Sequence, residues 1–312
     1  MSSDPFPPTR SRPYAGDADF WRVRALLLET YPITPTEWNW EIRRWDGHRF
    51  HRAPSDPQLG EEYPACLWET TDGRLVAAAH DDGGGEAALQ LHPDFRHLEE
   101  EMVAWVETNL AAAGQDGVHR RLQVYAHDYD SPRRRLLARR GYEPVEGTGV
   151  MRRLRLGQRP LPEPGEVSGY LLRPTRLGDG GEYGRLADLL NAGFGRTFHT
   201  AAEYRNFVEG SPSFRHDLNL IAEAPGGSFA AHVGLTYDEV NRRAIVEPVV
   251  TRPDHRRRGL ARALMLEGCR RVRALGATDV YVGTGDAVAA NELYEAVGFT
   301  EAYVGRTWRK VW

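Results

Sequence analysis

The residue types best suited to chemistry lie in the second half of the 312-residue chain. Arg256-Arg257-Arg258-Gly259-Leu260-Ala261 stands between a β-rich run and an amphipathic helical pattern. The N terminus of a helix presents unpaired backbone N–H groups and partial positive charge, which suits a diphosphate. Gly259 lets a ligand approach the backbone without a Cβ in the way, and the neighbouring guanidinium groups add charged contacts. The segment therefore predicts a phosphate-binding loop.

Two further residues have side chains that can move protons. Glu247 interrupts the otherwise apolar strand-like run Ala244 to Val250. Its apolar neighbours suggest burial, which is costly for a carboxylate without a task or partner; burial would raise its pKa, which suits a general base. The alternative is a glutamate paired with an arginine at the sheet edge. Tyr294, in a short helix that ends at Gly298, is the candidate acid, and core packing is its alternative.

An aromatic stretch earlier in this half offers contacts for a second substrate. Phe194 and Phe198 are candidates for its binding pocket, and His199 for orienting it. Aromatic residues at helical spacing are more often core, and a histidine here is more often at the surface.

Two segments resemble signatures of the GCN5-related N-acetyltransferase (GNAT) superfamily. Val249 to Ala261 matches its R/Q-x-x-G-x-G/A loop, and Asn291 to Phe299 matches its L-Y-x-x-x-G-F signature. The resemblance implies that the loop binds the pyrophosphate of acetyl-CoA. It also implies that Tyr294 protonates the departing thiolate. The family's basic glutamate falls at Ile245, and Glu247 shares that side of the strand.

The resemblance extends to the strand before the loop. Pro248 cannot donate to a sheet ladder and marks an edge or a bulge. In the family the strands splay here and the pantetheine arm enters, which makes a backbone N–H near Val249 the expected oxyanion donor. The family asparagine seven residues before the tyrosine is replaced by Ala287, beside Asp286. The predicted cofactor-binding residues are Val249, Val250, Thr251, Arg256, Arg257, Arg258, Gly259, Leu260, Ala261, Arg262, Asp286 and Asn291.

The two halves of the chain look like versions of one unit. Pro93-Asp94-Phe95-Arg96 corresponds to Pro253-Asp254-His255-Arg256, and Gly141-Tyr142 corresponds to Gly298-Phe299 at nearly the same offset. Chance similarity of αβ patterns is the alternative. The Pro- and Gly-rich residues 158–169 are the expected linker between domains 1–157 and 170–312.

The expected fold is α/β (α+β), with two tandem GNAT-like domains. Each has a central mixed, mostly antiparallel twisted sheet flanked by helices, and the strands splay at the cofactor site. The tandem arrangement is similar to that of mycothiol synthase and its relatives.

The first half lacks the residues that carry the chemistry. Aligned on the prolines, Glu99 and Glu101 replace Gly259 and Ala261, and like charges there would repel a diphosphate. Leu137 stands in place of Tyr294. We expect the N-terminal domain neither to bind acetyl-CoA in the standard way nor to catalyse. A cofactor bound without turnover is the alternative.

The composition argues against several classes of protein. The net charge of −4 does not favour nucleic acid or an anionic membrane, and no apolar run approaches a membrane span. Cys66 and Cys269 are too few for a metal cluster or disulfide framework, so we expect buried thiols, no metal and a cytoplasmic protein. A monomer or a homodimer is expected.

The predicted function is transfer of acetyl from acetyl-CoA to a primary amine of a small molecule by direct attack in the C-terminal domain. The alternatives are a non-catalytic acyl-CoA-binding or sensor protein and an N-acetyltransferase of proteins or peptides. The sequence does not exclude transfer of acyl groups longer than acetyl.

Overall fold

The computed structural model describes residues 6–52, 63–114, 117, 119–157, 160–176 and 178–312. Its backbone divides into two compact units. Unit 1 comprises Met1–Ile42, Pro57–Val150 and Tyr303–Trp312, and unit 2 comprises Arg43–Asp56 and Met151–Ala302. In the part of the chain that the structure describes, no helix is long and apolar enough to cross a membrane.

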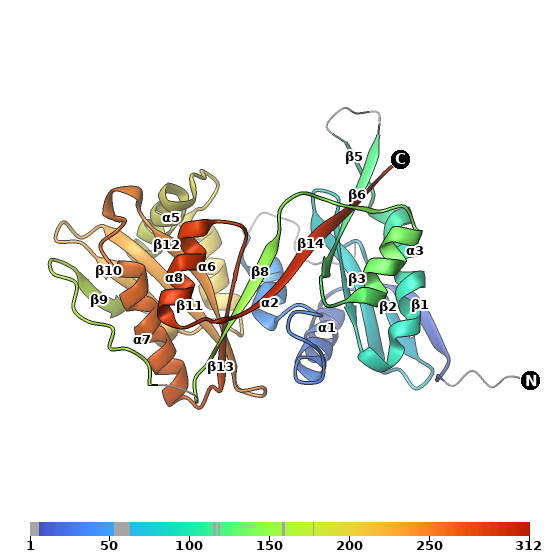
Figure 1. Cartoon of the computed structure of the whole chain (residues 1–312), viewed down its shortest axis with the longest axis horizontal. Coiled ribbons are helices and arrows are strands. Elements are labelled where there is room, and N and C mark those ends of the chain that lie inside the picture. Colours follow the sequence, from blue (N-terminus) through green and yellow to red (C-terminus); the bar gives the residue numbers. More distant parts are fainter. Residues whose placement is uncertain (1–5, 53–62, 115–116, 118, 158–159, 177) are drawn as a thin grey trace, which may run out of the picture. The chain divides into compact units, whose positions relative to one another are not determined.

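Unit 1 consists of a mainly antiparallel sheet with helices packed against it (Figure 1). Its strand order is β1-β2-β3-β4-β6-β14, in which only the β4–β6 pair is parallel. Met102 and Val103 of α3 and Leu136 of α4 share one core with Trp68 of β2. The elements are β1 (Thr9–Pro13), α1 (Asp17–Thr30), β2 (Ala65–Thr70), β3 (Leu75–Gly83), β4 (Glu86–Leu91), η1 (Pro93–Leu98), α3 (Glu99–Asn109), β5 (Ala112–Ala113), β6 (Arg120–His127), α4 (Ser131–Arg139), β7 (Glu143–Pro144) and most of β14 (Glu301–Val311).

Unit 2 has a sheet of the same kind, in the order β8-β13-β12-β11-β10-β9. The β12–β13 pair is parallel, whereas β11 is antiparallel to both of its neighbours. The elements are α2 (Ile42–Phe50), β8 (Gly149–Arg155), β9 (Leu171–Pro174), α5 (Gly180–Phe194), α6 (Ala201–Gly210), η2 (His216–Leu218), β10 (Asn219–Glu223), β11 (Phe229–Asp238), β12 (Arg243–Thr251), η3 (Pro253–His255), α7 (Leu260–Ala274), β13 (Asp279–Thr284) and α8 (Val288–Val297).

The helices of unit 2 cover both faces of its sheet (Figure 1). Leu220 and Ala222 of β10 belong to the core that contains Leu264 of α7, whereas Ile221 between them packs with Leu186 of α5. Successive strand residues point to opposite faces, so α7 and α5 lie on opposite sides of the sheet. This arrangement confirms the expected fold class of sheets flanked by helices.

The units differ in membership from the expected domains 1–157 and 170–312. Residues 151–157 lie in unit 2, where β8 stands beside β13, and residues 303–312 lie in unit 1, where β14 pairs with β6. Residues 43–56 also belong to unit 2. Asn206 of α6 donates a hydrogen bond of 2.8 Å to the carbonyl of Phe50 and thus links this segment to α6. Of the expected linker, residues 160–167 have no helix or strand, and 158–159 lie outside the described residues.

Candidate active site

The strands of unit 2 separate beside the expected acid and base. β12 and β13 pair from Arg243–Asp279 to Val246–Val282, where the register among the described residues ends. On the other side of β12, Val233 pairs with Val249 and Leu235 with Val246, so Glu247 and Pro248 together oppose Gly234. This extra residue makes a β-bulge.

Gly234 fits this bulge because it has no side chain. A Cβ there would lie 2.8 Å from the carbonyl oxygen of Glu247, closer than such atoms approach. Beyond Val246 the described residues show no pairing of β12 with β13, and we call this unpaired edge of residues 247–251 the opening in the sheet. Among the residues expected to meet the cofactor here, Val250 is buried, and Val249 and Thr251 are half-buried.

The predicted phosphate loop connects β12 to α7. Gly259 precedes α7 with a φ of 80°, in the left-handed region that favours glycine, and a Cβ there would meet nothing within 4 Å. In the described chain no side chain caps this helix N terminus. Arg256 to Gly259 are exposed, Leu260 is buried, and Ala261 and Arg262 are half-buried. The loop therefore presents backbone and arginine side chains to an approaching anion.

Arg256 is held in place by backbone carbonyls. Its Nη2 donates to the oxygen of Gly193 at 2.9 Å and its Nε to that of Thr251 at 3.3 Å. These bonds tie the loop to α5 and to the end of β12. Arg258 donates to the carbonyl of Asp254 at 3.5 Å, a long contact that leaves most of its donors for other partners.

Tyr294 and Glu247 lie close enough to interact electrostatically. Burial raises the pKa of Tyr294 to about 12, and the charge on Glu247 acts in the same direction. Tyr294 is buried on α8, with its ring 6.3 Å from that of Phe299. Tyr294 therefore carries its proton at neutral pH, as a proton donor must.

The expected burial of Glu247 is wrong. Its side chain is 48% exposed, because it stands at the bulge beside the opening instead of inside the paired part of the strand. Nη1 of Arg43, on α2, lies 3.3 Å from its Oε1. The guanidinium of Arg43 also lies 5.2 Å from the ring centroid of Phe207 on α6. The arginine pairing considered as the alternative for Glu247 is therefore present.

Asn291 and Asp286 lie at the start of α8. The Asn291 side chain donates at 3.0 Å to the carbonyls of Gly285 and Ala287 and accepts a 2.8 Å hydrogen bond from Arg152. Its amide is thus occupied in shaping this turn. Asp286 is exposed.

The aromatic residues on the acceptor side divide into two groups. Phe194 and Phe198 are 42% and 62% exposed, and the guanidinium of Arg196 lies over both rings. Tyr204 and Phe207 are buried in the core. The exposed pair therefore stays available for a ligand.

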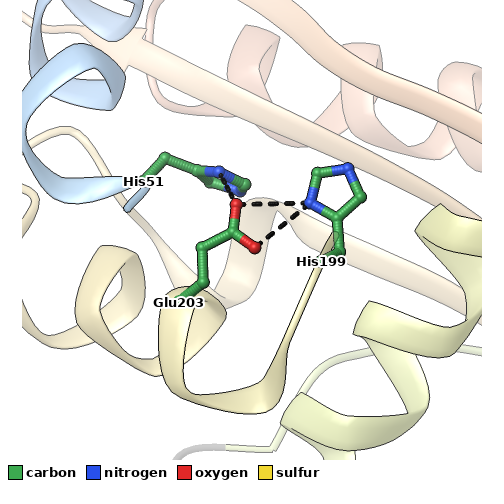
Figure 2. A group of neighbouring side chains, drawn as sticks. All are labelled: His51, His199 and Glu203. Carbon is green, nitrogen blue, oxygen red and sulfur yellow. Dashed lines mark hydrogen bonds and ion pairs between the residues drawn. The ribbon is translucent and has the colours of Figure 1, made fainter. Parts of the chain in front are cut away.

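His199 is largely buried. Its Nδ1 lies 3.2 Å from Oε1 of Glu203. Nδ1 of His51 lies 2.8 Å from the same oxygen (Figure 2). Burial lowers the pKa of His199, which favours the neutral imidazole. Burial alone raises the pKa of Glu203, but the contacts with His51, the backbone N–H of Thr200 and His199 together outweigh it, and the net shift is downward. The carboxylate is therefore charged.

At the corresponding positions of unit 1, the side chains make contacts within the protein. Glu99 forms an ion pair with Arg133, and both side chains are buried. Glu101 accepts a 2.9 Å hydrogen bond from the indole of Trp68. Leu137, at the place of Tyr294, is fully buried. Two of the carboxylates expected to repel a diphosphate are thus engaged in internal contacts.

Comparison with known proteins places these features in a family context. Residues 184–299 match the family model described as the acetyltransferase (GNAT) family. No curated protein sequence gives a match. The matched residues lie in the second half of the chain, within unit 2.

Solved structures resemble the chain over nearly its whole length. A GCN5-related N-acetyltransferase from Sphaerobacter thermophilus is 21% identical, with a TM-score of 0.65 over 97% of this chain and 95% of that one. A tandem GNAT protein from the clavulanic acid biosynthesis pathway is 16% identical, with a TM-score of 0.68 over 97% and 98%. A GNAT-family acetyltransferase from Colwellia psychrerythraea is 12% identical, with a TM-score of 0.61 over 96% and 100%. These likenesses show a tandem GNAT fold, while the resemblance to mycothiol synthase stays a prediction.

Sequence reasoning missed several residues at this site. Arg43 and His51 precede the rest of unit 2, which begins at Met151, by a hundred positions or more and match no motif there. Glu203 carried a local signal, because Thr200-x-x-Glu203 forms a capping box at the start of α6. Gly234 lies in a strand-like run, where an isolated glycine can mark a bulge.

Proposed function

We propose that this protein transfers an acetyl group from acetyl-CoA to a primary amine of a small molecule, with the reaction in unit 2. The observation that carries the proposal is the end of the β12–β13 pairing at Val246–Val282. Glu247 follows it and acts electrostatically on Tyr294, and in the described chain no side chain caps the start of α7. No metal is required for this reaction.

The loop before α7 fits the diphosphate of acetyl-CoA. Gly259 is exposed with open space around it, and exposed arginines precede it. Backbone N–H groups at the start of α7 would donate hydrogen bonds to phosphate oxygens, and the pantetheine arm would lie along Val249 to Thr251. Leu260, Ala261 and Arg262 complete the first turn of the helix. Asp286 would lie near the cofactor, whereas Asn291 would act by shaping the turn before α8.

The chemistry requires two proton transfers. The amine must lose a proton before or during attack, because a free alkylammonium has a pKa near ~10. Glu247, half-exposed at the opening, would take that proton directly or through water. The amine nitrogen then bonds to the thioester carbonyl carbon and the carbon–sulfur bond breaks. Tyr294 would protonate the departing thiolate, and a backbone N–H near Val249 would stabilise the carbonyl oxygen.

The acceptor amine would bind beside α5 and α6. Phe194 and Phe198 offer exposed apolar surface there, and Arg196 lies over both rings. His199 would position the acceptor through the loop that it anchors to Glu203.

Calorimetric titration of acetyl-CoA into wild type and Gly259→Glu tests the cofactor site. Glutamate at 259 brings bulk and negative charge to the diphosphate position, so binding should be lost. Gly73→Glu is a matched control, because Gly73 in unit 1 has a φ of 87° and the same open surroundings as Gly259 with its φ of 80°. The control should bind one equivalent, as wild type does. No binding by wild type, or unchanged binding by Gly259→Glu, would contradict the proposal.

A further inference from the structure

Three potential metal ligands converge in unit 2 from distant parts of the sequence (Figure 2). His51 follows α2, His199 precedes α6, and Glu203 lies in the first turn of α6. One nitrogen of each imidazole and one carboxylate oxygen all lie within 4.8 Å of one another. The side chains of His51, His199 and Glu203 are 21%, 8% and 9% exposed.

The two histidines present the same atom to the carboxylate. Nδ1 of His51 lies 2.8 Å from Oε1 of Glu203, and Nδ1 of His199 lies 3.2 Å from it. Ligand atoms on a transition metal with bonds of about 2.1 Å lie roughly 3–3.5 Å apart. The separations from Glu203 to each histidine are therefore close to those of a coordinated set.

The ligands are held by their surroundings. Oε2 of Glu203 accepts a 3.2 Å hydrogen bond from the backbone N–H of Thr200. Asn191 fixes the backbone of His199 on both sides, accepting from its N–H at 3.1 Å and donating to its carbonyl at 2.9 Å. Such outer contacts orient metal ligands and are a regular part of metal sites.

We propose that His51, His199 and Glu203 bind one divalent transition-metal ion of the zinc class. Two imidazoles and one carboxylate suit Zn²⁺, Co²⁺, Ni²⁺ or Fe²⁺ and not Mg²⁺ or Ca²⁺, which prefer oxygen ligands. Three protein ligands leave coordination positions for water. Coordination through Nδ1 places the imidazole proton on Nε2, and in His199 this buried atom has no other partner within the described chain.

The ion would join two segments that are distant in sequence. His51 follows the helix that carries Arg43, the partner of Glu247, and Glu203 begins the helix that carries Phe207. A metal would therefore fix α2 against α6 in unit 2. This role does not depend on acetyl transfer, so its test needs no acetyl acceptor.

The test is titration of Zn²⁺ into metal-free full-length protein by calorimetry, with Co²⁺ as a spectroscopic probe. Wild type should bind one ion tightly, and Co²⁺ should show the visible absorption of a site with nitrogen ligands. His51→Gln and Glu203→Gln should each weaken binding by about 100-fold or more. Glutamine at 203 can still complete the capping box with Thr200, so the start of α6 is preserved.

His48→Gln is the matched control, because His48 lies one turn earlier than His51 and outside the group. It should bind Zn²⁺ like wild type. Circular dichroism should show that all three variants are folded. Failure of wild type to bind Zn²⁺, or equal binding by His51→Gln and His48→Gln, would overturn the proposal and leave a purely hydrogen-bonded cluster.

Discussion

Tyr294 and Glu247 are proposed to share the work of proton transfer at the opening in the unit 2 sheet. They differ in environment, since Tyr294 is 6% exposed on α8 whereas the Glu247 side chain is half-exposed at the bulge. A buried phenol keeps its proton, and an exposed carboxylate can receive one from an arriving ammonium. This difference in exposure suits Tyr294 to the role of acid and Glu247 to the role of base, and neither role needs a metal.

Tyr294→Phe should lower kcat by about 100-fold or more while leaving the Kd for acetyl-CoA nearly unchanged, because only the proton donor is lost. Since the pKa of Tyr294 is raised to about 12, its acid form persists as pH rises through neutrality. The loss of activity caused by its ionisation should therefore appear only near pH 12. Steady-state kinetics with a panel of small primary amines across pH would measure both effects.

Two further variants belong in the same experiment. Tyr303→Phe removes a hydroxyl on β14, in unit 1, and should leave kcat unchanged. Glu247→Gln should lower kcat/KM for the amine without weakening acetyl-CoA binding, because the carboxylate is proposed to act on the acceptor. Full activity of Tyr294→Phe would remove the tyrosine from the mechanism.

Among the secondary-structure elements, the contact between α5 and β12 helps to position the site. Gly193, near the end of α5, approaches β12 so closely that a Cβ would lie 2.1 Å from Cγ2 of Val250. The carbonyl of the same glycine accepts the hydrogen bond from Arg256. One close helix–strand contact therefore supports both the strand at the opening and the loop before α7.

Gly193→Ala should destabilise the fold by roughly 1–3 kcal/mol, because the added methyl group overpacks the contact with Val250. The double variant Gly193→Ala/Val250→Ala removes Cγ2 and leaves the nearest atoms at 3.5–3.6 Å, an ordinary contact distance. Urea unfolding should show that the double variant is more stable than the sum of the single effects, with a coupling of roughly 0.5–3 kcal/mol. Strict additivity would argue against the close contact.

The whole molecule combines two related units, of which only unit 2 is proposed to react. In unit 1 the position of the phosphate loop holds the buried Glu99–Arg133 ion pair. Asp130 contributes to the same cluster. Burial alone would raise its pKa, but the charges of Arg133 and Arg96 hold the pKa of this carboxyl below its ordinary value. Charges that already neutralise one another leave little attraction for a diphosphate.

Glu99→Gln should lower the stability of the protein by about 3 kcal/mol, because it leaves Arg133 buried with less charge compensation. It should not change the affinity for acetyl-CoA or the stoichiometry of one, since the proposed cofactor site lies in unit 2. Thermal unfolding and calorimetric titration measure the two quantities. Glu100→Gln is the control, because the Glu100 side chain is 66% exposed and its replacement should leave stability nearly unchanged. A second equivalent of acetyl-CoA in wild type would contradict the assignment.

Local patterns in the sequence determined the fold class and the elements that carry the site. The strand-like run Ala244 to Val250 lies in β12, which extends one residue beyond it at each end. Gly298 has a positive φ at the end of α8, as its position suggested, and Gly259 also has a positive φ before α7. Hydrophobic period and left-handed glycines are local properties, so they can be read without knowledge of the tertiary structure.

The tertiary structure alone decided which distant residues share unit 2. No local pattern links Arg43 to Glu247 or His51 to Glu203, because these contacts depend on how α2 packs against α6. The exposure of Glu247 follows from the end of strand pairing, whereas its apolar neighbours suggested burial. The membership of β8 and β14 likewise depends on which strand edges pair. Packing and strand pairing are contacts between residues far apart in sequence, which is why the sequence pattern could not specify them.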